Sequence, residues 1–222
     1  AIQAMEAGKD VYVEKPLTIT IREGREMVKA QERTGRVCAV GLNRRGSSVY
    51  QKLAAEIQSG KIGKVTTSRA HRISNMFPDG IGRMKPEAPP PGLDWDMWLG
   101  PAPWRPYNKK LLDGFNFEKG GGLVGGGCLE WGSHCVDLCQ WAAGVDNTSA
   151  VEYLPPENGQ LVARYPNGVK LVLRNEGWLP LGSCPVRFEG DQGWVEAGDS
   201  GKLVLSSPEL LAGREVEEIG GY

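Results

Sequence analysis

Residues 7–17 of the 222-residue chain read Ala-Gly-Lys-Asp-Val-Tyr-Val-Glu-Lys-Pro-Leu. The β-branched and aromatic run from Val11 to Val13 predicts a short buried strand, and Pro16 ends it because proline cannot donate to a strand ladder. Gly8 predicts the end of a preceding helix, since glycine is favoured just past a helix C-terminus. The stretch therefore predicts a helix, a buried strand and a turn, in that order.

The residues that follow repeat this alternation. Thr18 or Thr20 can cap a helix over residues 21–34, and Gly35 stands where that helix would end. Residues 36–42 are again apolar and predict a second strand. Helices and strands that alternate with short connections are typical of a parallel α/β sheet. Two strands cannot form a stable parallel sheet by themselves, so we expect further strands upstream of the first residue.

From residue 47 onward the pattern favours an α+β arrangement. Apolar spacing predicts a helix over residues 47–60, a strand over 64–73 and a strongly apolar helix over 128–143. Residues 76–113 are rich in proline and tryptophan and predict a loop that packs over another part of the protein. The remainder consists of short apolar runs at residues 150–154, 159–165, 169–175, 185–189, 193–196 and 202–205. With a Pro-Asn-Gly hairpin signal at 166–168, these runs predict a mostly antiparallel sheet.

The composition is that of a globular protein. Lys and Arg total 26 against 27 Asp and Glu, which gives a net charge of −1, and 40% of the residues are hydrophobic. These values are far from the signature of a disordered chain. A nearly neutral chain gives no electrostatic reason to expect nucleic acid or an anionic membrane as a partner. No apolar run approaches the ~20 residues that a membrane-spanning helix needs.

The cysteines argue against a disulfide framework and a metal site. Five cysteines cannot all pair within one chain, and none forms a C-x-x-C motif. Cys135 and Cys139 lie four residues apart in the predicted apolar helix, so we expect small buried side chains rather than metal ligands acting with His134. Reduced thiols fit a cytoplasmic protein, with an export signal upstream of Ala1 left open.

The same helix carries the most informative polar residues. At about 100° per residue, Glu130, His134 and Asp137 fall within roughly 60° of one another on one helix face. Ionisable groups on an otherwise apolar helix are costly to bury unless they pair or line a cavity. Glu130 can orient the His134 ring, and a histidine can take a proton from a substrate hydroxyl at neutral pH. The alternative is a structural histidine with an ion-pair partner.

Lys15 is the second candidate for chemistry. It follows the first predicted strand directly, at the carboxyl edge of a parallel sheet, where open α/β folds bind ligands. Pro16 fixes the backbone there, and the bond between Lys15 and Pro16 can be cis. A lysine in a partly desolvated cleft can donate a hydrogen bond to a substrate oxygen. The alternative is a solvated lysine at a strand end.

Two glycine motifs favour plain structural interpretations. Residues 120–125 match G-x-G-x-x-G, but no clear strand precedes them, so we interpret them as a flexible entry to the apolar helix. Residues 198–201, Gly-Asp-Ser-Gly, are similar to a serine-protease nucleophile loop, yet a hairpin turn explains them better.

Taken together, four segments resemble the Gfo/Idh/MocA oxidoreductases, a family named for glucose–fructose oxidoreductase and inositol dehydrogenase. The first is residues 7–17, with Glu-Lys-Pro at 14–16, and the second is Val-Gly-Leu-Asn-Arg-Arg at 40–45. The third is Trp104-Arg105, followed by the Gly-Gly-Gly run, and the fourth is Glu-Trp-Gly-Ser-His-Cys-Val-Asp at 130–137.

The resemblance implies a fold of two domains. Residues 1–43 would be the C-terminal part of a Rossmann dinucleotide-binding domain. Residues 44–222 would be an incomplete α+β domain for substrate binding and oligomerisation, with a largely antiparallel open sheet. The first Rossmann strands would precede Ala1 and the C-terminal helices would follow Tyr222, so we expect a chain truncated at both ends.

The resemblance also implies site residues. Lys15 and His134 match the family's catalytic lysine and histidine, and Glu130 falls where many members carry aspartate. Residues near the nicotinamide and its ribose would be Glu14, Lys15, Pro16, Asn43, Trp104 and Arg105, and those on the substrate side would be Arg44, Tyr107 and Asp137.

The implied activity is hydride transfer between a sugar or polyol hydroxyl carbon and NAD or NADP. The enzyme would act on a small molecule and form homo-oligomers through the open sheet, and the fragment alone is expected to be inactive. Two alternatives stay open. One is a redox-neutral, NAD-dependent glycosidase of the same family, and the other is a non-catalytic fragment for oligomerisation or sugar binding.

Overall fold

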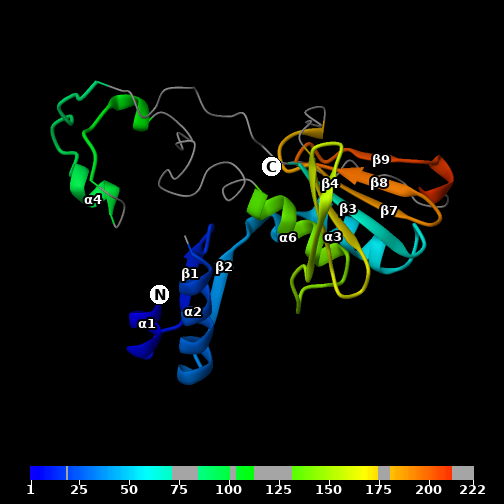
Figure 1. Ribbon diagram of the computed structural model, residues 1–222, viewed down its shortest axis with the longest axis horizontal. Coiled ribbons are helices and arrows are strands. Elements are labelled where there is room, and N and C mark those ends of the chain that lie inside the picture. Colours follow the sequence, from blue (N-terminus) through cyan, green and yellow to red (C-terminus); the bar gives the residue numbers. More distant parts are fainter. Residues whose placement is uncertain (19, 72–84, 101–103, 113–131, 175–180, 212–222) are drawn as a thin grey trace.

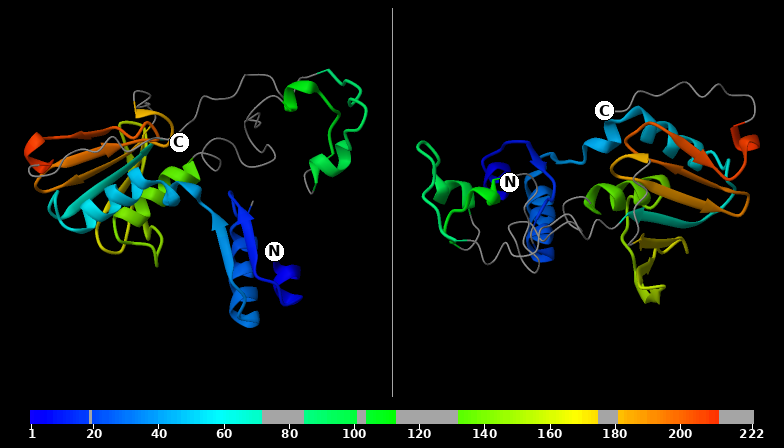
Figure 2. Two further views of the ribbon diagram at one scale, coloured as in Figure 1. Left: turned by 180° about the vertical axis from the view of Figure 1, so that it is seen from behind. Right: turned by 90° about the horizontal axis from the view of Figure 1, so that it is seen from above.

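The computed structural model describes residues 1–18, 20–71, 85–100, 104–112, 132–174 and 181–211. Within these ranges the chain forms a small N-terminal unit with two strands and a larger unit built on a seven-stranded sheet (Figure 1). Figure 2 shows the N-terminal unit, in blue, standing apart from the large sheet, with the chain passing between the two units after its second strand.

The N-terminal unit contains α1 (Ile2–Glu6), β1 (Val11–Glu14), α2 (Ile21–Thr34) and β2 (Cys38–Gly41). The strands pair in parallel, with Glu14 opposite Gly41 at their carboxyl ends. α2 begins at a capping box, in which Thr20 accepts from the Glu23 amide and the Glu23 carboxylate accepts from the Thr20 amide. It ends at Gly35, which has a left-handed φ of 65°. The predicted alternation of helix and strand and the parallel pairing are both confirmed.

The larger unit is mostly antiparallel, as predicted. Its elements are η1 (Asn43–Gly46), α3 (Ser48–Gln58), β3 (Val65–His71), α4 (Trp95–Leu99), η3 (Lys109–Leu111), α6 (Gly132–Ala142), β4 (Glu152–Glu157), β5 (Gln160–Arg164), β6 (Lys170–Arg174), β7 (Val186–Gly190), β8 (Trp194–Ala197), β9 (Leu203–Leu205) and η5 (Pro208–Leu211). The strand order is β4-β5-β6-β3-β7-β8-β9, and only β3 and β6 pair in parallel. The predicted hairpin forms between β5 and β6, where Gly168 has a φ of 90°.

The main core lies between the sheet and two helices, α3 and α6, which contact each other and the same strands. α3 contributes Val49, Leu53 and Ile57, which follow helical spacing. α6 contributes Cys135 and Cys139, both fully buried and both free thiols. The prediction that these cysteines are small buried side chains is confirmed, and burial raises the pKa of the Cys139 thiol.

Residues 85–100 and 104–112 differ from the loop that their composition predicts. Residues 95–99 and 109–111 are short helices, and Asp94 caps the first by accepting from the Met97 amide. Trp95 stacks on Trp98 with ring centroids 4.8 Å apart, and its indole N–H donates to the Arg105 carbonyl. The buried side chains of this segment form a cluster separate from the main core, namely Trp95, Leu99, Tyr107 and Leu111. Its aromatic residues thus pack on one another.

In the part of the chain that the structure describes, every helix is too short or too polar to cross a bilayer.

Candidate active site

Four of the residues expected near the nicotinamide, Glu14, Lys15, Pro16 and Asn43, lie where β1 and β2 end. Glu14 is the last residue of β1, and it is followed by Lys15 and Pro16, which are joined to each other by a cis peptide bond. Asn43 begins η1 two residues after the end of β2. Because the strands are parallel and Glu14 lies opposite Gly41, these ends share one edge of the sheet. Open α/β sheets bind their ligands at this edge.

His134 lies in the first turn of α6 and is only 2% exposed. Burial is the main cause that lowers its pKa. The charges of Arg44 and Lys15 lower the pKa further, against the opposing charge of Asp199, to about 4. The imidazole is therefore neutral at pH 7 and has a nitrogen lone pair that can accept a proton. Lys15, from the N-terminal unit, is thus one of the charges that act on the imidazole.

Glu130 and the glycine motif at 120–125 lie outside the described residues. The predicted contact between Glu130 and His134 therefore stays a prediction.

Arg44, expected on the substrate side, is held by an acidic partner that the sequence did not single out. Its Nη2 atom lies 2.8 Å from Asp199 Oδ2, and the two side chains are only 15% and 11% exposed. Burial favours the neutral guanidine, but the hydrogen bond with Asp199 outweighs this effect and raises the pKa of Arg44. Burial likewise opposes ionisation of Asp199, yet hydrogen bonds from Arg44, Ser183 and Tyr50 hold its pKa below the ordinary value. The pair stays ionised at neutral pH.

No local signal could have revealed the role of Asp199. The motif at 198–201 forms a turn between β8 and β9, as predicted. The partners of Asp199 come from Arg44 and Tyr50, which lie 155 and 149 residues away in the chain. Only the three-dimensional fold brings them together.

Asp137, also expected on the substrate side, is engaged by a different arginine. Both carboxylate oxygens accept from Arg45, at 2.8 Å from Nε and 2.7 Å from Nη2. Arg45 also pairs with Asp146 and lies over the Trp141 ring. Asp137 therefore ties α6 to η1 in the structure.

The remaining predicted residues belong to the 104–112 segment. Trp104 is 70% exposed. Tyr107 is 6% exposed and meets Trp95 edge to face, with ring centroids 5.2 Å apart. Within the described ranges, Tyr107 packs on Trp95, Leu99 and Leu111 of its own segment.

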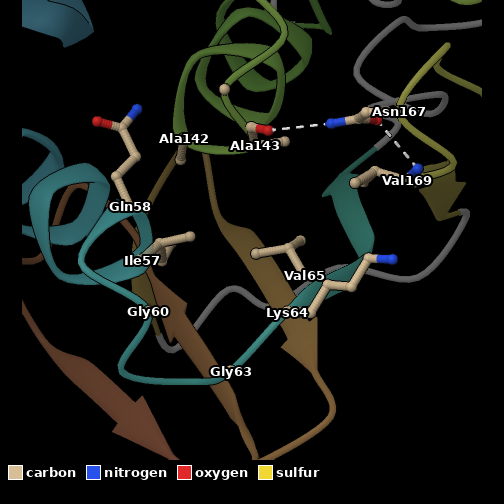
Figure 3. A pocket seen from close by; sticks show the side chains of 11 residues that line it. Ile57, Gln58, Gly60, Gly63, Lys64, Val65, Ala142, Ala143, Asn167 and Val169 are labelled. Carbon is tan, nitrogen blue, oxygen red and sulfur yellow. Dashed lines mark hydrogen bonds between the residues drawn. The ribbon is translucent and has the colours of Figure 1, made fainter.

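A pocket of about 380 Å³ lies at the opposite end of the helices from His134 (Figure 3). It is lined by the C-terminal ends of α3 and α6, including Ile57 and Ala142, and by Lys64, Val65 and Asn167. Asn167 donates to the Ala143 carbonyl across its rim. None of the residues expected to bind cofactor or substrate lines this pocket. Within the described ranges, no group of His, Cys, Asp and Glu side chains could hold a metal ion.

Two models of one oxidoreductase family match the chain. The family's "NAD-binding Rossmann fold" matches residues 1–42, and its "C-terminal alpha/beta domain" matches residues 49–175, more than half of the chain. The chain belongs to the Gfo/Idh/MocA oxidoreductase family. The resemblance noted in the sequence is thereby confirmed.

Relatives of this Gfo/Idh/MocA chain include inositol dehydrogenases. It is 40% identical over 63 residues to scyllo-inositol 2-dehydrogenase (NAD(+)) of Bacillus subtilis, a match covering 28% of this chain and 18% of that protein. It is 41% identical over 64 residues to inositol 2-dehydrogenase of Pseudomonas fluorescens, covering 28% and 19%.

Solved structures of the Gfo/Idh/MocA type share the fold. An oxidoreductase domain protein from Kribbella flavida matches with a TM-score of 0.56 and 24% identity, covering 94% of this chain and 55% of that one. An oxidoreductase from Agrobacterium radiobacter, in complex with NAD+, L-tartaric acid and magnesium, matches with a TM-score of 0.57 and 15% identity, covering 94% and 54%. The chain thus spans about half the length of these structures.

Proposed function

We propose that the protein acts as an NAD(P)-dependent oxidoreductase that transfers a hydride between a sugar or polyol carbon and nicotinamide. The observation that carries the proposal is the buried, neutral His134 with the Lys15 charge beside it at the carboxyl edge of a parallel strand pair. The names of the matching relatives, among them two inositol dehydrogenases, favour a cyclic polyol or sugar as substrate.

The residues at this edge fit a nicotinamide nucleotide. Glu14, Lys15 and Asn43 offer hydrogen-bonding groups beside the strand ends, where dinucleotides bind in open α/β sheets. We assign Glu14, Lys15, Pro16 and Asn43 to the cofactor, together with Trp104 and Arg105. When bound, the nicotinamide ring supplies the acceptor or donor of the hydride.

His134 acts as the base in this proposal, taking the hydroxyl proton of the substrate. A pKa near 4 makes it a weak base. It suffices because loss of hydride turns the alcohol into a protonated carbonyl, whose proton is strongly acidic. Lys15 donates a hydrogen bond to the same oxygen, and Glu130 orients the imidazole ring. Arg44 lies near His134 on the substrate side.

Tyr107 and Asp137 complete the proposed substrate side. Both oxygens of Asp137 already accept from Arg45. In this proposal Asp137 therefore holds α6 against η1 and does not accept a hydrogen bond from a substrate hydroxyl.

The domain division that we propose is residues 1–43 for the cofactor and 44–222 for substrate and assembly. We also propose that copies associate through the sheet face opposite α3 and α6. On that face Arg69, Arg187 and Glu196 form a ladder of ion pairs with Glu189 and one another.

A substrate screen with the full-length protein tests the proposed function. Inositols and aldoses are offered with NAD or NADP, and reduced cofactor is followed by its absorbance. His134→Ala should lower kcat about 10²–10⁴-fold, the usual contribution of a general base, with cofactor affinity retained. Gln140→Ala on the same helix, where Gln140 bonds to the Thr148 carbonyl, is the matched control and should keep activity.

Three outcomes would contradict the proposal. They are an unchanged kcat in His134→Ala, no oxidation of any polyol by the wild-type protein, and release of sugar from glycosides without reduced cofactor. The last would indicate a redox-neutral glycosidase.

A further inference from the structure

A buried set of hydrogen-bonded side chains lies near the start of α6, where Tyr50 shares the main core with Cys135. We call Arg44, Tyr50, Ser183 and Asp199 the Asp199 cluster. Arg44 Nη2 and the Ser183 hydroxyl both donate to Asp199 Oδ2, the former at 2.8 Å. The Tyr50 hydroxyl lies 2.8 Å from Asp199 Oδ1 and 2.9 Å from the Cys184 carbonyl. Both oxygens of the carboxylate are therefore fixed, by side chains from η1, α3 and the segment before β7.

The backbone around Asp199 is also tightly held. The Asp199 amide donates to the Ser183 carbonyl at 3.0 Å, so the two turns lie against each other. A Cβ on Gly198 would stand 2.2 Å from the Leu181 carbonyl oxygen, a contact that only glycine avoids. Gly182, on the facing turn, has a φ of 84°. The position of the carboxylate is thus set by packed backbone rather than by a loose turn.

The Asp199 cluster reaches the proposed base through Arg44. η1, which carries Arg44, packs against α6, which carries His134. The Arg44 side chain is only 15% exposed, and a charge at that depth is costly unless it is paired. Without its carboxylate partner, the flexible guanidinium would turn toward water and leave its place beside α6.

We propose that Asp199 is a positioning residue of this active site, which holds the Arg44 guanidinium near the start of α6 and so keeps the His134 imidazole unprotonated and able to receive the substrate proton. The inference rests on the proposed function of His134 as the base. Asp199 itself touches no reacting atom and acts through Arg44.

Removing the Asp199 charge can change the pKa of His134 in either direction, and the direction observed tests the proposal. Among the described residues, the charges that act on His134 are Lys15 after β1, Arg44 in η1 and Asp199 in the β8–β9 turn. Arg44 lowers the pKa of His134 more than Asp199 raises it. If Arg44 stays in place without Asp199, the pKa of His134 falls. If Arg44 leaves, the pKa rises.

The experiment is a pH titration of the His134 imidazole by ¹⁵N NMR in the full-length protein, with the signal assigned by its loss in His134→Gln. In Asp199→Asn we expect the pKa of His134 to rise by about 1, on the scale that a neighbouring charge produces. Adding Arg44→Met to Asp199→Asn should cause no further rise. Asp146→Asn removes the partner of a neighbouring arginine, Arg45, and is the matched control that should leave the pKa unchanged.

A lower or unchanged pKa in Asp199→Asn overturns the proposal. If circular dichroism shows that this variant does not fold, Arg44→Met replaces it. That variant removes the guanidinium that Asp199 holds, so the pKa of His134 should again rise, and an unchanged or lower value again overturns the proposal. The titration needs neither substrate nor turnover. The polyol screen with wild-type protein tests the proposed function separately, because it measures substrate oxidation and not the pKa of His134.

Discussion

At the scale of single residues, His134 couples the stability of the fold to pH. Its pKa is about 4 in the folded protein and near 6.5 in an unfolded chain. Between these values the unfolded state binds more protons, so the free energy of unfolding falls as the pH drops from 6.5 toward 4. Below pH 3.8, protonation of Asp199, whose folded pKa is lowered, acts in the same direction.

We expect the full-length protein to lose roughly 2 kcal/mol of unfolding free energy between pH 7.5 and 4.5 through His134. Urea unfolding at the two pH values measures the loss, and His134→Gln should remove that part of it. His71→Gln, which changes the other histidine of the chain, should retain the full pH dependence attributed to His134. An equal loss in wild type and His134→Gln would show that this histidine is not the group responsible.

At the scale of elements, local capping sets where α2 begins. Thr20 and Glu23 exchange hydrogen bonds at the helix start, whereas Ser47, at the same position of α3, makes no side-chain capping bond. Thr20→Ala should therefore weaken the first turn of α2 by about 1 kcal/mol. Hydrogen exchange of the first-turn amides should then be roughly five-fold faster. Ser47→Ala is the control, and an effect on α3 as large as that on α2 would contradict the capping argument.

Such local signals explain which elements could be predicted from the sequence. The ends of α2 follow from Thr20 and Gly35, and the β5–β6 hairpin follows from the turn at 166–168, because each depends only on near neighbours. Residues 95–99 were expected to be loop because prolines flank them on both sides, and the short helix they form is stabilised by packing of Trp95 on Tyr107. Contacts between segments that lie far apart in the sequence gave no comparable signal.

The residues of the candidate site likewise differ in whether the local sequence could reveal them. His134 and Lys15 could be singled out because an ionisable group on an apolar helix and a lysine after a buried strand are unusual in themselves. In the folded protein the charge of Lys15 acts on the His134 imidazole. Asp199 could not be found, because a Gly-Asp-Ser-Gly turn is ordinary until Arg44 and Tyr50 are folded against it. Its importance arises from tertiary structure alone.

At the scale of the whole molecule, the sheet face opposite α3 and α6 carries both apolar and charged residues. The face opposite α3 and α6 carries a row of paired residues that crosses all seven strands in the order Leu154, Val162, Val172, Arg69, Arg187, Glu196 and Val204. Its ends are apolar and its centre is charged. The charges are paired, with Arg187 Nη1 2.9 Å from Glu196 Oε1. Val162 and Val172 are themselves buried, whereas Val204 is exposed, so the Val204 end of the row is the apolar part that a second copy could contact.

Val204 offers a direct test of association through this face. It lies next to Glu196 in the row and is 41% exposed. Val204→Lys places a positive charge beside a carboxylate, so the isolated subunit should keep its fold, while burying that charge between copies should weaken association at least about tenfold. Sedimentation of the full-length protein measures the change. Tyr153→Lys, at an exposed position on the opposite face, should associate like the wild type. A monomeric wild type, or equal weakening by both variants, would show that copies do not meet through this face, because only Val204 lies on it.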